Sequence, residues 1–208
     1  MKVGVLALQG TFIEHIEILQ RLGVEAPPVR LPHELHALDG LIIPGGESTT
    51  VLRLMKSSRL IHSIKEMAMS GLAIWGTCAG MVLLANSISN YQMETLGLMG
   101  MKIRRNAFGS QPDSFEMDLE IPSLGERPFH AVFIRAPVIE EAEPGVEILS
   151  RLPNGAVVSA RQNRLLACAF HPEFTSDVRF HNYFLDMVDR KVSHNPEEGI
   201  LQRKRATA

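Results

Sequence analysis

A cysteine in the stretch Gly76-Thr77-Cys78-Ala79-Gly80 is the first candidate for chemistry in this sequence. The spacing is that of the G-x-S-x-G nucleophile elbow, with cysteine in place of serine. Residues 72–75 before it predict a short buried strand, and residues 81–85 after it predict an apolar helix. A helix N-terminus favours a thiolate at Cys78, and the N–H of Ala79 points to where an oxyanion would form. On this motif alone, a buried structural cysteine is the alternative.

A histidine and a glutamate two residues apart supply the matching base. His171-Pro172-Glu173 follows the apolar run 165–170, which predicts a buried strand. Residues i and i+2 of an extended segment face the same side, so we expect His171 and Glu173 to lie side by side. A carboxylate beside an imidazole fixes its tautomer and stabilises its charged form. Alone, His171 could be a surface histidine near a chance glutamate, but together with Cys78 the pair predicts a Cys-His-Glu triad.

Composition limits the classes of protein to which this chain can belong. Its 208 residues fit one domain, and 45% hydrophobic with 21% charged residues is usual for a soluble globular protein. A formal net charge of −2 gives no reason to expect nucleic acid or a membrane as a partner. With only two cysteines, no signal-peptide pattern and no membrane-length apolar run, we expect a cytoplasmic protein without disulfides. Neither a metal-ligand cluster nor a phosphate-binding loop is apparent, so no metal and no cofactor are predicted.

Strand-like and helical stretches alternate along the first half of the chain. This pattern predicts an α/β fold with three α/β/α layers and an open, mostly parallel, flavodoxin-like sheet. Short alternating strands at 129–134, 146–149 and 156–160 predict an antiparallel extension. We expect residues 1–192 to form a single domain and residues 193–208, which lack periodicity, to form a disordered tail. The other elements are expected as strands at 3–8, 41–43, 72–75 and 165–170 and as helices at 12–22, 51–56, 60–70 and around 180–188.

Small and polar residues follow several of these strands directly. They are Gln9-Gly10, Gly45-Gly46-Glu47, Cys78 and His171. Because ligands in open α/β sheets bind at the carboxyl ends of the strands, we expect these residues to gather at one edge. Gly46 can donate a second oxyanion hydrogen bond beside Ala79, and Glu47 can hold an ammonium group. A Gly-Gly turn followed by a Ser/Thr helix cap is the structural alternative.

The chain resembles the class I, triad-type glutamine amidotransferases and, within them, the glutaminase subunits of pyridoxal 5′-phosphate synthases. The resemblance extends from residue 7 to residue 173. It rests on Ala7-Leu8-Gln9-Gly10, Pro44 to Thr50, Gly76 to Gly80, Arg105-Asn106-x-Phe108-Gly109, Ser114-Phe115-Glu116, Phe133-Ile134-Arg135-Ala136-Pro137 and Phe170-His171-Pro172-Glu173.

This resemblance implies that Cys78 attacks the side-chain amide of L-glutamine, that His171 transfers protons and that Glu173 orients His171. Gly46 and Ala79 would form the oxyanion hole. The ammonia would pass to a synthase subunit in a large hetero-oligomer that makes pyridoxal 5′-phosphate. The glutamine pocket implied by the resemblance comprises Gly45, Gly46, Glu47, Arg105, Ile134 and Arg135. The charges of Arg105 and Glu47 suit the carboxylate and ammonium groups of glutamine.

Three other functions stay open at this point. The chain could be a glutaminase that serves another synthase, a cysteine peptidase or deglycase on the same fold, or a scaffold without activity. Ser110 stands where the family more usually has arginine, which leaves the contacts of that loop open. Cys168 is expected to face the core, and His15 is expected as a plain helix histidine or one near a partner surface.

Overall fold

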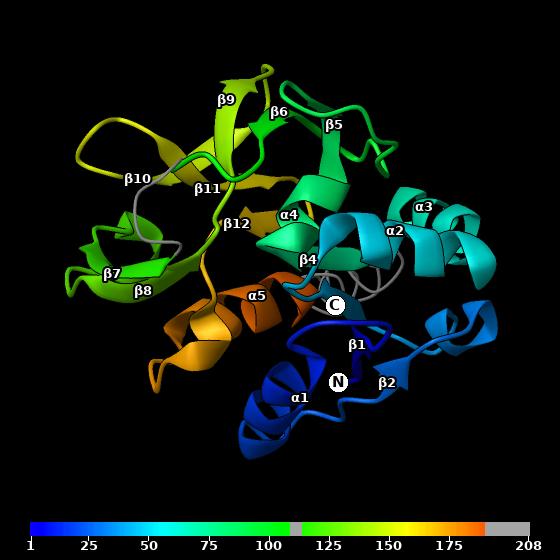
Figure 1. Ribbon diagram of the computed structural model, residues 1–208. Helices are drawn as coiled ribbons and strands as arrows, with labels where there is room; N and C mark the ends of the chain where they lie inside the picture. The colour runs from blue at the N-terminus through cyan, green and yellow to red at the C-terminus, as the bar shows by residue number, and fades with distance from the viewer. Residues whose placement is uncertain (109–113, 190–208) are drawn as a thin grey trace, which may run out of the picture.

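The computed structural model describes residues 1–108 and 114–189 (Figure 1). The predictions about Ser110 and about the tail at 193–208 fall outside the described residues. The boundary of the single domain at residue 192 lies there too and stays a prediction.

The centre of the described part is a ten-stranded sheet. Its hydrogen-bonded order is β2-β1-β3-β4-β12-β11-β9-β6-β5, and β10 pairs with β11. A separate two-stranded ribbon pairs β7 (Ser114–Leu119) with β8 (Phe129–Ile134). The strands of the main sheet are β1 (Val3–Leu6), β2 (Pro28–Val29), β3 (Gly40–Ile43), β4 (Ala73–Thr77), β5 (Ala85–Ile88), β6 (Met99–Arg104), β9 (Val138–Ala142), β10 (Glu147–Arg151), β11 (Val157–Gln162) and β12 (Leu165–Cys168).

One half of the sheet is parallel and the other half is mostly antiparallel. All neighbours from β2 to β12 pair in parallel, and β1, β3 and β4 are buried along their whole length. This burial explains why these strands appear in the sequence as continuous apolar runs. Strand β11 runs antiparallel to both β12 and β9, and β6 runs antiparallel to β9. The predicted antiparallel extension is therefore confirmed, except that β8 belongs to the ribbon and not to the sheet.

Helices cover both faces of the parallel half (Figure 1). Helices α2, α3 and α4 lie on one face, and α1 and α5 lie on the other. The fold is the predicted three-layer α/β/α arrangement. The helices are α1 (Phe12–Arg21), α2 (Ser48–Ser57), α3 (Leu60–Met69), α4 (Ala79–Leu84) and α5 (Arg179–Asp189), with short 3₁₀ helices η1 (Pro32–Leu35), η2 (Pro122–Leu124) and η3 (Pro172–Phe174).

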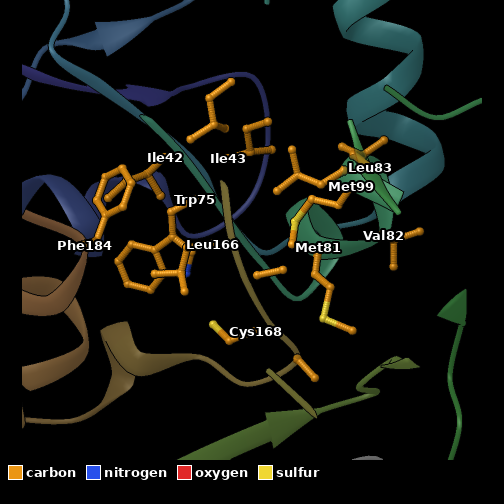
Figure 2. Packing of buried hydrophobic residues seen from close by; sticks show 14 of the residues in the cluster. Ile42, Ile43, Trp75, Met81, Val82, Leu83, Met99, Leu166, Cys168 and Phe184 are labelled. Atoms are coloured by element: carbon orange, nitrogen blue, oxygen red, sulfur yellow. The ribbon is translucent and has the colours of Figure 1, made fainter. Parts of the chain in front are cut away.

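Side chains of β3, β4 and β12 form the core between the helical layers (Figure 2). Trp75 of β4 is fully buried, and its ring lies 5.5 Å from that of Phe184 on α5. Cys168 is also fully buried, and its thiol donates to the carbonyl of Phe170 at 3.5 Å. Burial raises the pKa of the Cys168 thiol well above its usual value, so this cysteine is an inert core residue, as expected.

Candidate active site

The nucleophile elbow forms where β4 meets α4. Cys78 has φ 47° and ψ −100°, a strained backbone conformation that a non-glycine residue rarely adopts. A Cβ on Gly76 would collide with the backbone of Gly80, and a Cβ on Gly80 would collide with the carbonyl of Ile43. The two glycines therefore allow the helix to start directly against the sheet, with the first free N–H groups of α4 beside Cys78.

His171 and Glu173 lie together immediately after β12. The Nδ1–H of His171 donates to Oε1 of Glu173 at 2.7 Å, which leaves the other ring nitrogen for Cys78. The sequence predicted that these two side chains lie together, but the reason given for it was wrong. Residues 172–174 form the 3₁₀ helix η3, not an extended segment, with Pro172 at its first turn. The short helical turn brings the carboxylate back to the imidazole.

The electrostatics of the pair favour a charged imidazole. Burial by itself lowers the pKa of His171, but the neighbouring Cys78 and Glu173 side chains outweigh it and raise this pKa to about 10. Burial by itself raises the pKa of Glu173, but His15 and His171 outweigh it and hold this pKa below its usual range. An imidazolium between a carboxylate and a thiol stabilises the thiolate, which is the reactive form of cysteine.

The absence of a side chain at Gly45 leaves room for the imidazole ring of His171. A Cβ on Gly45 would lie 2.9 Å from Nδ1 of His171 and closer still to Cε1, so only glycine allows the imidazole to pack on this loop. The carbonyl of Gly45 accepts the N–H of Thr11 at 3.0 Å. Because the carbonyl and N–H of a trans peptide point in opposite directions, the N–H of Gly46 points away from Thr11.

The loop after β1 clamps the loop after β3. The side-chain oxygen of Gln9 accepts the N–H of Glu47 at 2.8 Å. Gly10 has φ +106°, and a Cβ there would collide with the carbonyl of Gly45. These contacts fix the backbone of residues 45–47 next to Cys78, at the carboxyl ends of the strands where the sequence predicted them.

Glu47 has two roles that the sequence did not separate. Its Oε2 caps α2, accepting the N–H of Thr50 at 3.0 Å and the hydroxyl of Thr49. Its Oε1 pairs with Arg105 at 3.1 Å. The helix cap expected from Ser or Thr is therefore Glu47 itself. Arg105 also stacks on Tyr91, with 4.7 Å between the guanidinium carbon and the ring centre, so its charge is held in a fixed position.

These elements enclose a pocket of about 310 Å³ beside Cys78. Of the ten candidate residues from the sequence, Gly45 and Glu173 do not line it, since both lie behind His171. The lining comprises Gln9, Gly10, Thr11, Gly46, Glu47, Ser48, Cys78, Ala79, Val82, Arg105, Asn106, Ile134, Arg135, Pro137, His171 and Phe174.

Strained backbone is concentrated at this pocket. Five non-glycine residues of the described ranges have positive φ, and three of them, Cys78, Asn106 and Arg135, line the pocket. Such conformations persist where the surrounding structure imposes them, often at functional sites. The strain at Arg135 accompanies a close approach of the ribbon to the nucleophile, since Sγ of Cys78 lies 3.8 Å from the carbonyl of Ile134.

Three further residues surround the triad. Thr11 precedes α1 but makes no side-chain cap bond, and instead donates to Oε1 of Glu173 at 2.6 Å. Phe174 stacks on the ring of His171, with 5.3 Å between ring centres. His15 was expected as a plain helix histidine or one near a partner surface, but it is fully buried against Glu173. Only a burial pattern along α1 with His15 on its inner face could have indicated this.

Among residues 1–108 and 114–189, no group of three or more His, Cys, Asp or Glu side chains is arranged to hold a metal ion. No helix of the same ranges is long and apolar enough to cross a membrane.

Solved structures with this fold are glutamine amidotransferases and related proteins. One, described as a glutamine amidotransferase, is 48% identical, has a TM-score of 0.85 and is matched over 90% of this chain and 98% of its own. A Thermoplasma acidophilum protein described as part of a GMP synthase has a TM-score of 0.71 at 16% identity, which shows the fold alone. The fold and site therefore define a class I glutamine amidotransferase.

The chain belongs to the SNO glutamine amidotransferase family, whose model matches residues 5–190. Two relatives carry the name pyridoxal 5′-phosphate synthase subunit PdxT. That of Moorella thermoacetica is 55% identical over 90% of this chain and 100% of its own. That of Herpetosiphon aurantiacus is 56% identical with the same coverage. The predicted family and fold are confirmed.

Proposed function

We propose that this chain is the glutaminase subunit of a pyridoxal 5′-phosphate synthase. It hydrolyses L-glutamine and supplies the ammonia to a synthase subunit for vitamin B6 biosynthesis, within a hetero-oligomer. The observation that carries the proposal is the pairing of His171 with Glu173 at 2.7 Å beside the Cys78 elbow. Relatives that are more than half identical over their whole length bear the name of that subunit. We also propose a cytoplasmic location, in keeping with two free cysteines.

The proposed reaction begins when the Cys78 thiolate attacks the side-chain carbonyl carbon of glutamine. A C–S bond forms, and the oxygen takes the negative charge between the N–H groups of Ala79 and Gly46. The His171 imidazolium gives its proton to the amide nitrogen, the C–N bond breaks and ammonia leaves. The product is a γ-glutamyl thioester.

A water molecule then completes the cycle. Neutral His171 takes a proton from the water, whose oxygen bonds to the thioester carbon. The C–S bond breaks, glutamate leaves and the thiolate–imidazolium pair is restored. Throughout both steps Glu173 keeps the imidazole in one tautomer and stabilises its charge.

The pocket suits one small zwitterion. Its volume of about 310 Å³ lies at the small end of the range for ligand sites. Arg105 presents a cation for the substrate carboxylate, and Glu47, which already balances Arg105, presents an anion for the ammonium. A cysteine peptidase needs a groove for an extended chain and has no use for paired charges in so small a pocket, so this arrangement favours the free amino acid.

Replacing Arg105 with methionine tests the substrate pocket. We expect KM for glutamine to rise about 10- to 150-fold, because a hydrogen bond to a charged group is worth about 1.5–3 kcal/mol, while kcat changes much less. Steady-state ammonia release measures both constants. The control is Arg104→Met, since Arg104 is adjacent but exposed and paired with Glu140 at 3.1 Å. An unchanged KM in the Arg105 variant would show that Arg105 does not bind glutamine.

Replacing Gly45 with alanine tests the space beneath His171. The new methyl group would overlap the imidazole, which must then move away from Cys78. We expect kcat to fall at least about 100-fold, since small misplacements of reacting groups cost this much. Gly100→Ala serves as control, because the three nearest atoms to its methyl group would all belong to the exposed side chain of Glu143. Wild-type kcat in Gly45→Ala, with the fold intact, would contradict the close packing of His171 on Gly45.

The experiment that tests the proposed function is an ammonia assay with and without the synthase subunit from the same organism. Glutamine should yield ammonia and glutamate, and the two subunits should copurify. Cleavage of peptides or deglycation without any glutaminase activity would favour another cysteine hydrolase. Ammonia release that responds only to a different synthase would keep the reaction and reassign the partner.

A further inference from the structure

A row of buried polar side chains continues behind Glu173, beyond the residues that the proposed mechanism uses. His15 on α1 and His181 on α5 are both 0% exposed. Nδ1 of His15 lies 3.0 Å from Nε2 of His181. Both imidazoles pack edge-on against Trp75, whose place in the core Figure 2 shows. Burying two imidazoles is costly unless their nitrogens are used.

The two oxygens of Glu173 have different surroundings. Oε1 accepts from His171 at 2.7 Å and from Thr11 at 2.6 Å. Oε2 is buried and has no regular hydrogen-bond partner within the described part of the chain. Nε2 of His15 lies 3.3 Å from this oxygen, a distance of electrostatic contact with a bond angle that is not ideal. A buried charged oxygen without a regular hydrogen bond depends strongly on an ionic contact such as this one.

The contacts allow one favourable arrangement of protons. A proton on Nε2 of His15 faces the carboxylate, so in the neutral ring Nδ1 is an acceptor and Nε2–H of His181 must donate to it. Nδ1 of His181 then carries no proton, which agrees with its lack of a hydrogen-bond partner among the described residues. The reverse arrangement would leave a buried N–H of His181 unpaired and turn a lone pair of His15 toward the carboxylate. Burial and the nearby His15 lower the pKa of His181 well below its usual value, so this ring is neutral.

We propose that His15 is a positioning residue for Glu173, holding its second oxygen through Nε2–H while His181 fixes the tautomer of His15. This role rests on the proposed glutaminase function. A carboxylate bound on Oε1 alone can rotate about its terminal bond and loosen its hold on His171. Contacts on both oxygens prevent this, and the hydroxyl of Thr77, 3.5 Å from Nε2 of His15, helps to hold the ring.

The tautomers can be read directly on the wild-type protein, without any activity. Long-range ¹H–¹⁵N correlation spectra of the ¹⁵N-labelled chain distinguish a proton on Nδ1 from one on Nε2. The peaks are assigned with the variants His15→Phe and His181→Phe. We expect both histidines to be protonated on Nε2 only, because a proton on Nδ1 of His15 would face the proton on Nε2 of His181 across 3.0 Å. A proton on Nδ1 of His15 with a bare Nε2 would overturn the proposal.

Kinetics test the consequence for the reaction. His15→Phe keeps an aromatic ring but removes the donor, and we expect kcat to fall about 10- to 100-fold, as when a partner that orients a functional histidine is lost. KM should change less than threefold, since His15 does not line the pocket. His15→Gln places an amide N–H near the former Nε2 and should recover much of kcat.

Trp75→Phe is the matched control, because it disturbs the same buried cluster without touching Glu173. We expect kcat of this variant to stay near the wild-type value even if its melting temperature falls. Equal losses of kcat in His15→Phe and Trp75→Phe, without recovery in His15→Gln, would show that His15 only packs the core and does not position Glu173. If His15→Phe does not fold, the wild-type spectra and the kcat of His15→Gln still test the proposal. Failure of the proposed function would appear separately, as no ammonia release by the wild-type complex.

Discussion

Alanine at Cys78 is expected to abolish ammonia release from glutamine, by at least about 10⁴-fold, and to leave the fold unchanged. No other group at the site can form the thioester, because the second cysteine lies in the core. Alanine removes only the sulfur from an elbow whose shape is set by Gly76 and Gly80. The ammonia assay measures the loss, and thermal unfolding measured by circular dichroism verifies the fold.

Cys168→Ala is the matched control and should keep its activity, with at most a modest loss of stability. A diazo-ketone analogue of glutamine should add its mass to Cys78 in the wild-type protein and inactivate it. The mechanism is wrong if the label lands on Cys168 while Cys78→Ala stays active.

Replacing Glu173 with glutamine should lower kcat by about 10³- to 10⁴-fold, as the loss of the orienting carboxylate does in other triads. Glutamine keeps the shape but loses the charge that helps to raise the pKa of His171 to about 10. Without this charge the pKa of His171 falls, so the imidazolium loses its proton at a lower pH. The alkaline limb of the activity profile should therefore move to lower pH, which a pH series of kcat/KM measures.

Glu116→Gln provides the comparison, since Glu116 also bonds a histidine, His130, at 2.9 Å, but on the exposed face of the ribbon. This variant should match the wild type in kcat and in pH profile. If Glu173→Gln raises KM and preserves kcat, Glu173 would belong to substrate binding and not to proton transfer.

The sequence was sufficient to predict which segments meet at the site, because parallel strands end at the same edge of a sheet. Gln9, Gly46, Cys78 and His171 each follow a strand of the parallel half, and all four line one pocket. The buried strands could be recognised because their apolar runs are continuous. Their observed ends differ from the prediction by about two residues, as is usual where the last hydrogen bonds depend on neighbours.

The antiparallel half was predicted less completely. Strands β5, β6, β7 and β9 were not predicted individually, since their edges and exposed faces carry polar or charged residues that do not distinguish a strand from a loop. The pairing of β8 with β7 could not be distinguished from pairing with the sheet, because an alternating strand suits either partner.

The contacts of Glu173 could not be predicted from the sequence, for a different reason. Thr11 lies 162 residues from its partner Glu173, and no local pattern marks such a contact. A threonine before a helix normally indicates a cap, and a histidine on a helix normally indicates a surface. At Thr11 and His15, tertiary contacts with the carboxylate replace these local preferences.

The reacting groups and one wall of the pocket lie on different parts of the fold, the parallel sheet and the β7–β8 ribbon. The sheet holds the reacting groups, whereas the ribbon places the carbonyl of Ile134 3.8 Å from the sulfur of Cys78 and leads into Arg135 of the pocket wall. The ribbon is linked to the sheet side by the N–H of His171, which donates to the carbonyl of Val132 at 2.8 Å.

Arg105 and Glu47, which carry the charges proposed for glutamine, lie outside the ribbon. Changes in the ribbon can therefore reshape the pocket wall near the sulfur while the charge pair and the reacting groups stay the same. Exchanging the ribbon between relatives is thus a route for altering this wall, provided that the backbone link at Val132 is preserved.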